Sequence, residues 1–391
     1  MKELGDDMVK YCAGFPLAII ILGGILTINY GLPKVLFHQS KKKEGDEGQI
    51  AEDVAERYLM ELVEGCMIQV RERDVETLNM RSFHMHDLMR DICLSKAKQE
   101  KFLYVADQSN SCQLATIGRV RRVSVHKLFP IQCIKSPCLR SLLFFDAFLP
   151  DEELEKVLLL TMVRVLDYER GGDAGCKLPN DIGKLIHLRF FRLRDLNFWS
   201  SKLPSSLGNL RFLQTLDLRI IGRWSNSIRV PNVIWRMEKL IHLYLPSKCK
   251  SKTKLKLGTL KNLQTLVNFN TKNCYLKDLI NMTNIRELEI QGHFNIEDFY
   301  TEELGRNPAI VQSRYLHSLS IINDEGRIDP RHLTHLLSSC NSISRLSLDV
   351  KIRRLPKYHY LSTNLAYIKL RKCKLEEYPI PTLEKLLLKD A

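Results

Sequence analysis

Apolar residues recur along most of this chain in segments of the form L-x-x-L-x-L. These segments begin at Leu139, Val163, Leu188, Leu213, Leu240, Leu263, Ile285, Leu316, Ile343, Leu365 and Leu383. Successive starts lie 18 to 31 residues apart, and most lie 22 to 27 apart. A repeat of this length predicts a unit made of one short strand and a return segment. One unit cannot bury its apolar side alone, so neighbouring units must stack into a solenoid.

The repeats predict an α/β leucine-rich repeat solenoid over residues 111–391, with a parallel β-sheet on its concave face. Residues 120–125 are predicted to form the strand that starts it. Because side chains alternate along a strand, the fourth and sixth positions of each segment face the core, and the third, fifth and seventh face the concave side. The eleventh segment is the last of the chain, so the sequence predicts a solenoid without a closing helix.

Upstream of the repeats, the pattern predicts a small winged-helix unit over residues 50–110. Ile50, Val54, Tyr58 and Leu62 form one apolar stripe at helical spacing. Residues 66–70 are typical of a strand and residues 71–77 of a polar hairpin. A second amphipathic helix is predicted to run to Lys98. Its expected inward residues are Met85, Leu88, Ile92 and Leu94.

Residues 1–49 contain one long apolar stretch, residues 13–28. It is interrupted by Gly14, Pro16 and two further glycines, and it is shorter than the roughly 20 residues of a membrane-spanning helix. No net positive charge precedes it, as a signal peptide would require. We therefore expect a buried helix in a helical region over residues 1–33. A junction loop over residues 34–49, rich in charge and glycine, follows it.

The net charge of +14 is unevenly distributed. Residues 1–110 contain 14 Lys/Arg and 18 Asp/Glu, which leaves 45 and 27 for residues 111–391, a net charge of +18. A basic solenoid can attract acidic partners or the acidic N-terminal part of the chain. The sequence contains no Arg/Gly-rich tract and no aromatic-and-basic stacking motif, so we do not expect nucleic-acid binding.

The 11 cysteines are scattered singly, without a C-x-x-C pair. An odd count without a repeating spacing favours thiols in a reducing compartment over a disulfide framework. His84 and His86 have no second pair of metal-binding residues nearby, so no metal site is predicted.

Two short motifs upstream of the repeats carry a family resemblance. The segment Gly14–Ala18 (GFPLA) resembles the G-L-P-L-A motif of plant NBS-LRR disease-resistance proteins. Residues 85–87 (MHD), followed by Leu88-Met89-Arg90-Asp91, are similar to the M-H-D motif of the same family and look like its coiled-coil class. Both motifs precede the repeats in the expected order. The resemblance covers nearly the whole chain, from the end of the nucleotide-binding (NB-ARC) region through the leucine-rich repeats.

The resemblance implies a nucleotide switch that binds ADP or ATP. It places Pro16 near the adenine and His86 near the diphosphate, and it gives Asp87 the role of supporting the switch. The chain departs from the family because it contains no G-x-x-x-x-G-K-[ST] loop, which cradles phosphates and binds Mg²⁺. We therefore expect a partial sequence that binds no nucleotide by itself and has no catalytic residues. Pro16 as a helix-breaking turn and His86 as a helix-start residue are the alternative interpretations.

Strand alternation assigns specific side chains to the concave face. Asp167, Arg192 and Asp217 would form an exposed ladder of alternating charge, in which each pair contributes only about 0–1 kcal/mol. Glu287, Glu289 and Gln291 would form an acidic rung. The last three rungs turn basic and are the strongest candidate for partner contact. The predicted partner-binding face comprises Arg192, Arg194, Arg219, Tyr244, Arg345, Tyr367, Lys369, Arg371, Lys385 and Lys389.

The leading hypothesis is a partial plant immune receptor, located in the cytoplasm, that recognises a pathogen effector or a guarded host protein. Its repeats would also restrain a nucleotide-binding domain, either its own or that of another receptor. One alternative is an ATPase switch complemented in trans. Another is an extracellular leucine-rich repeat receptor or adhesion module, which the glycosylation sequon at Asn281 favours. Glycosylation of a secreted form at Asn281 would decide for the extracellular reading.

Overall fold

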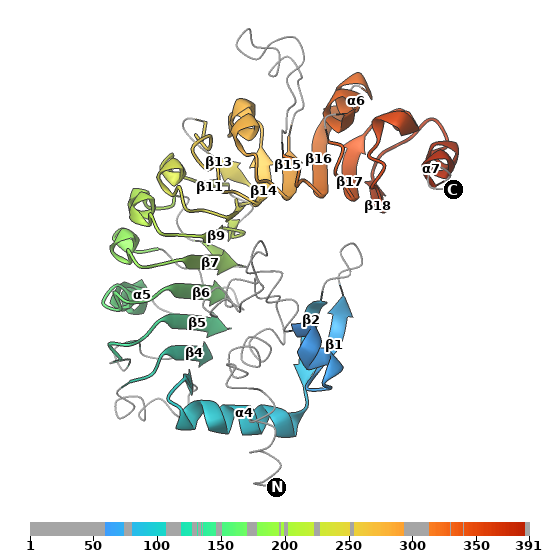
Figure 1. Cartoon of the computed structure of the whole chain (residues 1–391). Helices are drawn as coiled ribbons and strands as arrows, with labels where there is room; N and C mark the ends of the chain where they lie inside the picture. The colour runs from blue at the N-terminus through green and yellow to red at the C-terminus, as the bar shows by residue number, and fades with distance from the viewer. Residues whose placement is uncertain are drawn as a thin grey trace. The chain divides into compact units, whose positions relative to one another are not determined.

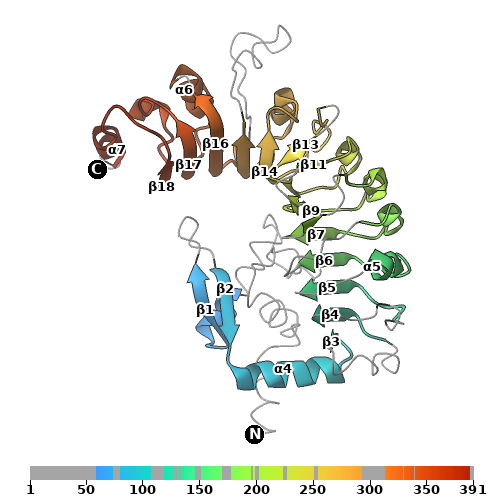
Figure 2. The ribbon, with the colours of Figure 1, turned by 180° about the vertical axis from the view of Figure 1, so that it is seen from behind.

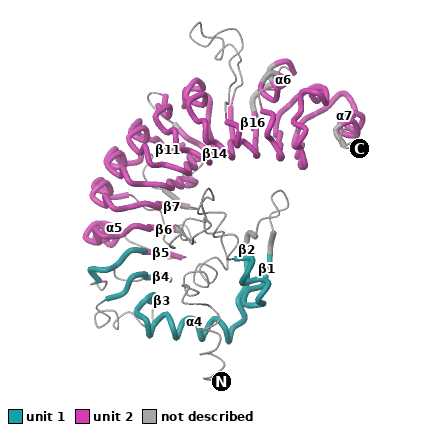
Figure 3. The backbone as a smooth tube through the Cα atoms, viewed as in Figure 1, with its two compact units in different colours: residues 1–106, 112–124, 135–141 teal, residues 107–111, 125–134, 142–391 magenta. Residues whose placement is uncertain are grey.

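The structure is a computed structural model of the chain. It describes residues 59–73, 80–106, 119–126, 131, 134, 136–145, 151–169, 178–194, 197–198, 202–222, 227–250, 254–292, 313–328, 330–338 and 340–387. The chain divides into two compact units (Figure 3). Unit 1 comprises residues 1–106, 112–124 and 135–141, and unit 2 comprises residues 107–111, 125–134 and 142–391. The predicted segments 1–33 and 34–49 lie outside the described residues.

Within unit 1, a β-hairpin precedes a helix. Strand β1 (Ile68–Arg73) pairs antiparallel with β2 (Met80–Met85), and helix α4 (Asp87–Gln99) follows directly. Residues 59–64 are helical as well. This order of helix, hairpin and helix is the predicted winged-helix arrangement. The hairpin is longer than predicted, because residues 80–85 form its returning strand. The sequence predicts that Met85, at the end of this strand, belongs to the second helix.

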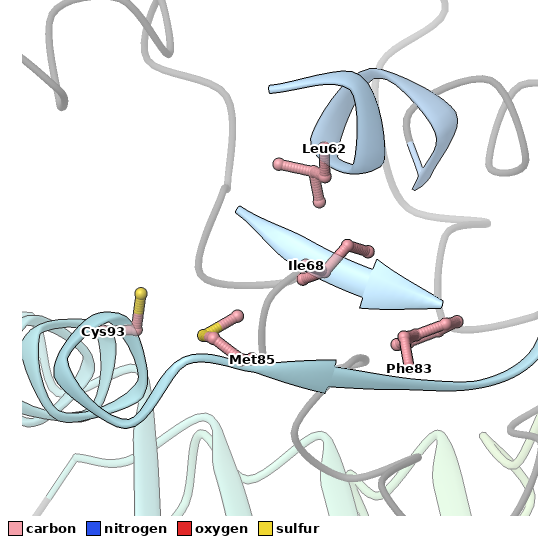
Figure 4. Packing of buried hydrophobic residues seen from close by; sticks show 5 residues of the cluster. All are labelled: Leu62, Ile68, Phe83, Met85 and Cys93. Atoms are coloured by element: carbon pink, nitrogen blue, oxygen red, sulfur yellow. The ribbon is translucent and has the colours of Figure 1, made fainter. Parts of the chain in front are cut away.

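One small apolar cluster joins these elements (Figure 4). Leu62, Ile68, Phe83, Met85 and Cys93 are its buried members, and Figure 4 shows them converging from the helical turn, both strands and α4. The cluster confirms the inward direction of Leu62 and Met85. Ile68 on β1, Phe83 on β2 and Cys93 on α4 supply the rest of it.

The predicted inward face of α4 is wrong at two positions. Leu88 is 59% exposed and Ile92 is 43% exposed, whereas Cys93 and Ala97 are buried. The physical reason is the position of the helix start. Because α4 begins at Asp87, after a strand that buries Met85, the helical period cannot be counted from Met85. The buried positions follow Met89, which packs on the cluster, at intervals of four residues.

A 12-stranded sheet runs through the rest of the chain in the order β18-β17-β16-β15-β14-β12-β9-β7-β6-β5-β4-β3. From β6 to β18 each strand pairs in parallel with its neighbour. The strands are β3 (Leu103–Ala106), β4 (Arg122–His126), β5 (Ser141–Phe145), β6 (Val165–Glu169), β7 (Phe190–Arg194), β9 (Thr215–Asp217), β12 (His242–Tyr244), β14 (Thr265–Asn270), β15 (Glu287–Gln291), β16 (Ser318–Arg327), β17 (Arg345–Lys351) and β18 (Tyr367–Arg371).

The return segments of unit 2 carry short helices and two small strand pairs. In Figures 1 and 2 the sheet strands of unit 2 lie on the inner side of its curved ribbon, with α5 and α6 on the outer side. Strands β8 (Asn197–Phe198) and β10 (Ile221–Gly222) pair in parallel, as do β11 (Ile228–Arg229) and β13 (Cys249–Lys250). The helices are α5 (Asp151–Val157), η4 (Ile182–Lys184), η5 (Ser205–Asn209), η7 (Ile234–Arg236), η8 (Leu276–Asn281), α6 (Pro330–Ser338), η11 (Tyr358–Tyr360) and α7 (Ile380–Leu387).

The L-x-x-L-x-L segments predict the register of this sheet. In ten of the eleven segments a strand begins two residues after the first apolar position, from Ser141 after Leu139 to Tyr367 after Leu365. The apolar positions stack across strands: Leu216 lies beside Leu243, and Leu243 beside Leu266. The strand predicted at residues 120–125 is present as β4. The sheet also includes β3, N-terminal to the predicted start at residue 111.

The eleventh segment does not form a strand. Residues Ile380–Leu387 form helix α7, so the predicted rung of Lys385, Leu387 and Lys389 is wrong. Lys385 lies on the helix, and Lys389 lies outside the described residues. The segment begins only 18 residues after its predecessor, too few for a full return segment, and Pro379 stands directly before the helix, where proline is well tolerated.

Candidate functional site

The Met-His-Asp motif lies at the junction of β2 and α4. His86 is the N-cap of α4, and its Nδ1 accepts a hydrogen bond from the Leu88 amide at 3.3 Å. Asp87 begins the helix and forms an exposed ion pair with Arg90 at 2.8 Å. A capping side chain and an acidic first residue both suit a helix start. His86 thus lies at a helix start, and Pro16, its predicted partner in nucleotide binding, lies outside the described residues.

The charged ladder of the concave face contains a fully buried ion pair. Arg192 on β7 donates two hydrogen bonds to Asp167 on β6, from Nε to Oδ1 at 2.6 Å and from a terminal nitrogen to Oδ2 at 2.7 Å. Both side chains are 0% exposed. The expectation of surface pairing is thus wrong here. Strand alternation gives the direction of a side chain, but it does not say whether that side chain is covered.

The next rung is partly exposed and connects charge to an aromatic ring. Arg219 donates from Nε to Asp217 Oδ1 at 2.9 Å and also bonds Oδ2 through its second nitrogen. Its guanidinium lies 4.4 Å from the ring centroid of Tyr244, within the range of a cation–π interaction. These contacts hold Arg219 and Tyr244 together; the sequence predicted both on the concave face but did not predict their contact. Arg194 ends β7, beside Glu169 on β6.

Two carboxylates of β15 continue this surface. Burial raises the pKa of Glu287, although Arg345, His242 and Arg219 act in the opposite direction. Burial also raises the pKa of Glu289, although it accepts a hydrogen bond from Gln291 at 3.0 Å. Burial and the nearby Glu287 carboxylate raise the pKa of Tyr244. Glu289 is half-buried and Glu287 is exposed, so the two carboxylates can meet a cation of a bound partner.

Asn268 shapes this region, although it is not among the residues that the sequence predicted for the face. Its backbone is left-handed, with φ of 62°, and it coincides with a break in the register between β14 and β15. Its side chain donates to the Leu245 carbonyl at 2.7 Å and accepts a hydrogen bond from Gln291. The signal was available, because Asn268 occupies the sixth position of its segment, where the pattern requires an apolar residue.

Only some of the predicted basic residues near the C-terminal end lie on adjacent strands. Arg345 pairs in register with Tyr367, and Ser347 with Lys369. Arg371 is exposed but lies 3.7 Å from Asp349 on the adjacent strand. The structure therefore brings Arg345, Tyr367, Lys369 and Arg371 to adjacent strands of one face, and it moves Lys385 to a helix.

The described part of the chain shows neither a metal site nor a membrane span. No group of three or more His, Cys, Asp or Glu in it could hold a metal ion. Among the same residues, no helix is long and apolar enough to cross a bilayer. The described cysteines are thiols. Burial raises the pKa of Cys249 to about 11 and that of Cys340 to about 12, because it penalises the thiolate.

Comparison with known proteins identifies relatives over the whole chain. The chain is 32% identical to "Probable disease resistance protein RXW24L" of Arabidopsis thaliana, over 100% of this chain and 50% of that protein. It is 33% identical to "Probable disease resistance protein RF9" of the same organism, over 98% of this chain and 43% of that protein. The chain thus spans about half the length of the curated relatives it matches.

Family models describe the two parts of the chain, and a solved structure shows a distant likeness. The internalin inlF of Listeria monocytogenes covers 72% of this chain, and the match spans 75% of inlF, at 15% identity with a TM-score of 0.43, a likeness too distant to say anything about function. Residues 42–93 match the family described as "Disease resistance protein Winged helix domain", and residues 138–387 match "Leucine-rich repeat region". The chain belongs to the leucine-rich repeat family, and it joins that solenoid to a winged-helix domain of the disease resistance protein type.

Proposed function

We propose that this chain is the recognition part of a plant immune receptor that acts inside the cell. The observation that carries the proposal is the order of its two parts: a winged-helix domain of the disease resistance type stands directly before a leucine-rich repeat sheet. Relatives named as disease resistance proteins match 98% and 100% of the length of this chain. The function is binding of a protein, with no catalytic step.

The sheet face supports recognition by its chemistry. Tyr244 and Arg219 form an aromatic and cationic pair, and residue types of this kind often dominate the energy of protein interfaces. Glu287 and Glu289 offer the opposite charge two strands further along the sheet. A surface with both signs of charge and one fixed aromatic ring suits a protein partner, such as a pathogen effector or a guarded host protein, better than a uniform polyanion.

The cysteines support a location in the cytoplasm. Cys274, Cys340 and Cys373 are buried thiols, which is typical of proteins in a reducing compartment. Asn281 of the sequon ends η8 and is exposed, so it offers a direct check. A glycan on Asn281 of the protein isolated from plant tissue would contradict this location and favour an extracellular receptor.

This chain by itself is proposed to bind neither ADP nor ATP. His86 is engaged as the cap of α4, and the sequence contains no phosphate-binding loop. Isothermal titration calorimetry with ADP should therefore show no saturable heat for the full chain. Saturable binding that His86→Ala abolishes would contradict this part of the proposal.

The recognition function is tested in plants that lack the gene. A panel of pathogens should include one that grows more in these plants, and the wild-type gene should restore resistance. The double charge reversal Lys369→Glu with Arg371→Glu should fail to restore it. The matched control, Lys357→Glu with Lys374→Glu, changes the net charge equally at exposed positions off the predicted face and should restore it. Equal resistance from both double variants would contradict a role of this face.

A further inference from the structure

The turns that lead into successive sheet strands stack into one continuous border of unit 2. The backbone amide of Arg189 donates to the Arg164 carbonyl at 2.8 Å, Gln214 to Arg189 at 2.7 Å, and Ile241 to Gln214 at 2.8 Å. The same ladder continues from Gln264 to Ile241 and from Arg286 to Gln264. Equivalent turn residues of neighbouring repeats therefore lie about one strand spacing, roughly 4.8 Å, apart. We name residues 159–164, 184–189, 209–214, 235–241, 259–264, 281–286 and 313–317 the turn edge.

Large apolar side chains project from the first part of the turn edge into water. Three consecutive turns contribute apolar side chains that are 49% to 78% exposed: Leu159, Met162, Ile186 and Phe212. Trp235 extends the row into the next turn. The Arg236 guanidinium lies 5.3 Å from the ring centroid of Trp235. Isolated exposed apolar residues are ordinary, but a row of them in adjacent repeats indicates a contact surface.

Positive charge accompanies this apolar row. The turn edge carries the exposed cations Lys184, Arg189, Arg211, Arg236, Lys239, Lys261 and Arg314. The structure describes every residue of these turns, and Glu238 is the one carboxylate among them. Lys184 forms an ion pair with Asp181, which lies just outside the turn edge. In the described part of the chain, no carboxylate lies within ion-pair distance of Arg189, Arg211, Lys239 or Lys261. Among the described residues, these four cations therefore have no carboxylate partner.

We propose that the turn edge binds the surface of a membrane that contains anionic phospholipids. Cations alone would suit any polyanion, but exposed aliphatic side chains gain nothing from the phosphates of a nucleic acid. Leu, Met, Ile, Phe and Trp beside Lys and Arg can bury themselves at the boundary between lipid headgroups and acyl chains, while the cations meet the phosphates. Tight turns at the border of a sheet also present these side chains outward. This orientation suits a flat surface rather than an enclosed peptide.

Co-sedimentation of the full chain with lipid vesicles tests the proposal. The protein should sediment with vesicles of phosphatidylcholine and phosphatidylserine and remain in solution with phosphatidylcholine alone. Raising the salt concentration should weaken binding, because the attraction to the anionic surface is screened. Arg189→Glu with Arg211→Glu should lower the apparent affinity about tenfold or more. Phe212→Ser should lower it at every salt concentration, because it removes apolar contact rather than charge.

The matched control is again Lys357→Glu with Lys374→Glu, which makes the same change in net charge away from the turn edge. It should bind vesicles within about twofold of the wild type. The altered residues of all these variants are exposed, and circular dichroism establishes that each remains folded. Equal binding to both kinds of vesicle, equal loss in the control, or no loss in the turn-edge variants would overturn the proposal. Binding of polyglutamate in place of vesicles would also overturn it, in favour of an acidic protein partner.

Discussion

The sheet face carries two carboxylate–guanidinium pairs that differ in their exposure to water. Asp167 and Arg192 are fully buried, whereas Asp217 is buried and its partner Arg219 is partly exposed. A buried pair gains from mutual attraction but loses the hydration of both ions, so its net contribution to stability is small. Its two halves nevertheless depend on each other, because either charge left alone would be costly.

Asp167→Ala is expected to lower the free energy of unfolding by about 3–5 kcal/mol, because it leaves the Arg192 guanidinium buried without this carboxylate. Urea denaturation followed by circular dichroism measures the change. Asp181→Ala is the control, since it removes only the exposed pair with Lys184 and should cost less than about 1 kcal/mol. Equal costs for the two substitutions would show that the Asp167 pair is not removed from water.

Glu289 gives the protein a pH-dependent contribution to stability. Burial raises its pKa, so the folded protein holds this proton more tightly than the unfolded chain does. Its contribution is therefore complete below the ordinary glutamate pKa and is lost as the pH rises through the raised value. Glu289→Gln should raise the unfolding midpoint at neutral pH and leave it near that of the wild type in acid. Thermal scans at several pH values measure this difference, and the exposed Glu377→Gln should show no such trend.

At the scale of the element, the buried face of α4 differs from the face that the sequence predicts. The α4 register counted from Asp87 buries Cys93 and Ala97, and the strand before it buries Met85. The same boundary exposes Leu88 and Ile92, which helical spacing counted from Met85 had placed inside. The buried face of α4, at Met89, Cys93 and Ala97, thus lies one position further along the chain than the predicted Leu88 and Ile92.

Met85→Ala should destabilise the winged-helix region by about 2–5 kcal/mol, because it opens a cavity in the cluster of Figure 4. Leu88→Ala, on the exposed side of α4, should change stability by less than about 0.5 kcal/mol. Chemical denaturation of both variants compares them. A larger loss for Leu88→Ala would mean that α4 packs through the face that the sequence first predicted.

At the scale of the whole molecule, the repeats of unit 2 are held together by contacts between neighbours. Gly183 marks one such contact, because a Cβ there would lie 2.2 Å from the Ser206 carbonyl oxygen of the next repeat. The obstacle is backbone, so it cannot rotate away. Solenoids of this kind transmit disturbance mainly to adjacent units, since each repeat contacts only its neighbours.

Gly183→Ala should force the repeats of β7 and β9 apart and lower their local stability by more than about 1 kcal/mol. Hydrogen exchange followed by mass spectrometry should show faster exchange in residues 178–218 and unchanged exchange in residues 340–371. Thr259→Ala is a milder comparison, because it removes one exposed hydrogen bond between repeats, to the Trp235 carbonyl. Uniformly faster exchange along the chain would contradict a solenoid stabilised by nearest neighbours.

The sequence by itself determined the repeat architecture, the register of ten strands and the face to which Arg192, Arg219 and Tyr244 belong. It could do so because a period of two along a strand, repeated at nearly constant intervals, leaves only one way to bury the leucines. The hairpin partner Met80–Met85, the bulge at Asn268 and the helix α7 depended on tertiary packing, which overrides a short local pattern. Only the tertiary structure decided that Asp167 and Arg192 are buried and that Leu159, Met162 and Phe212 are exposed, because exposure depends on what the rest of the chain covers.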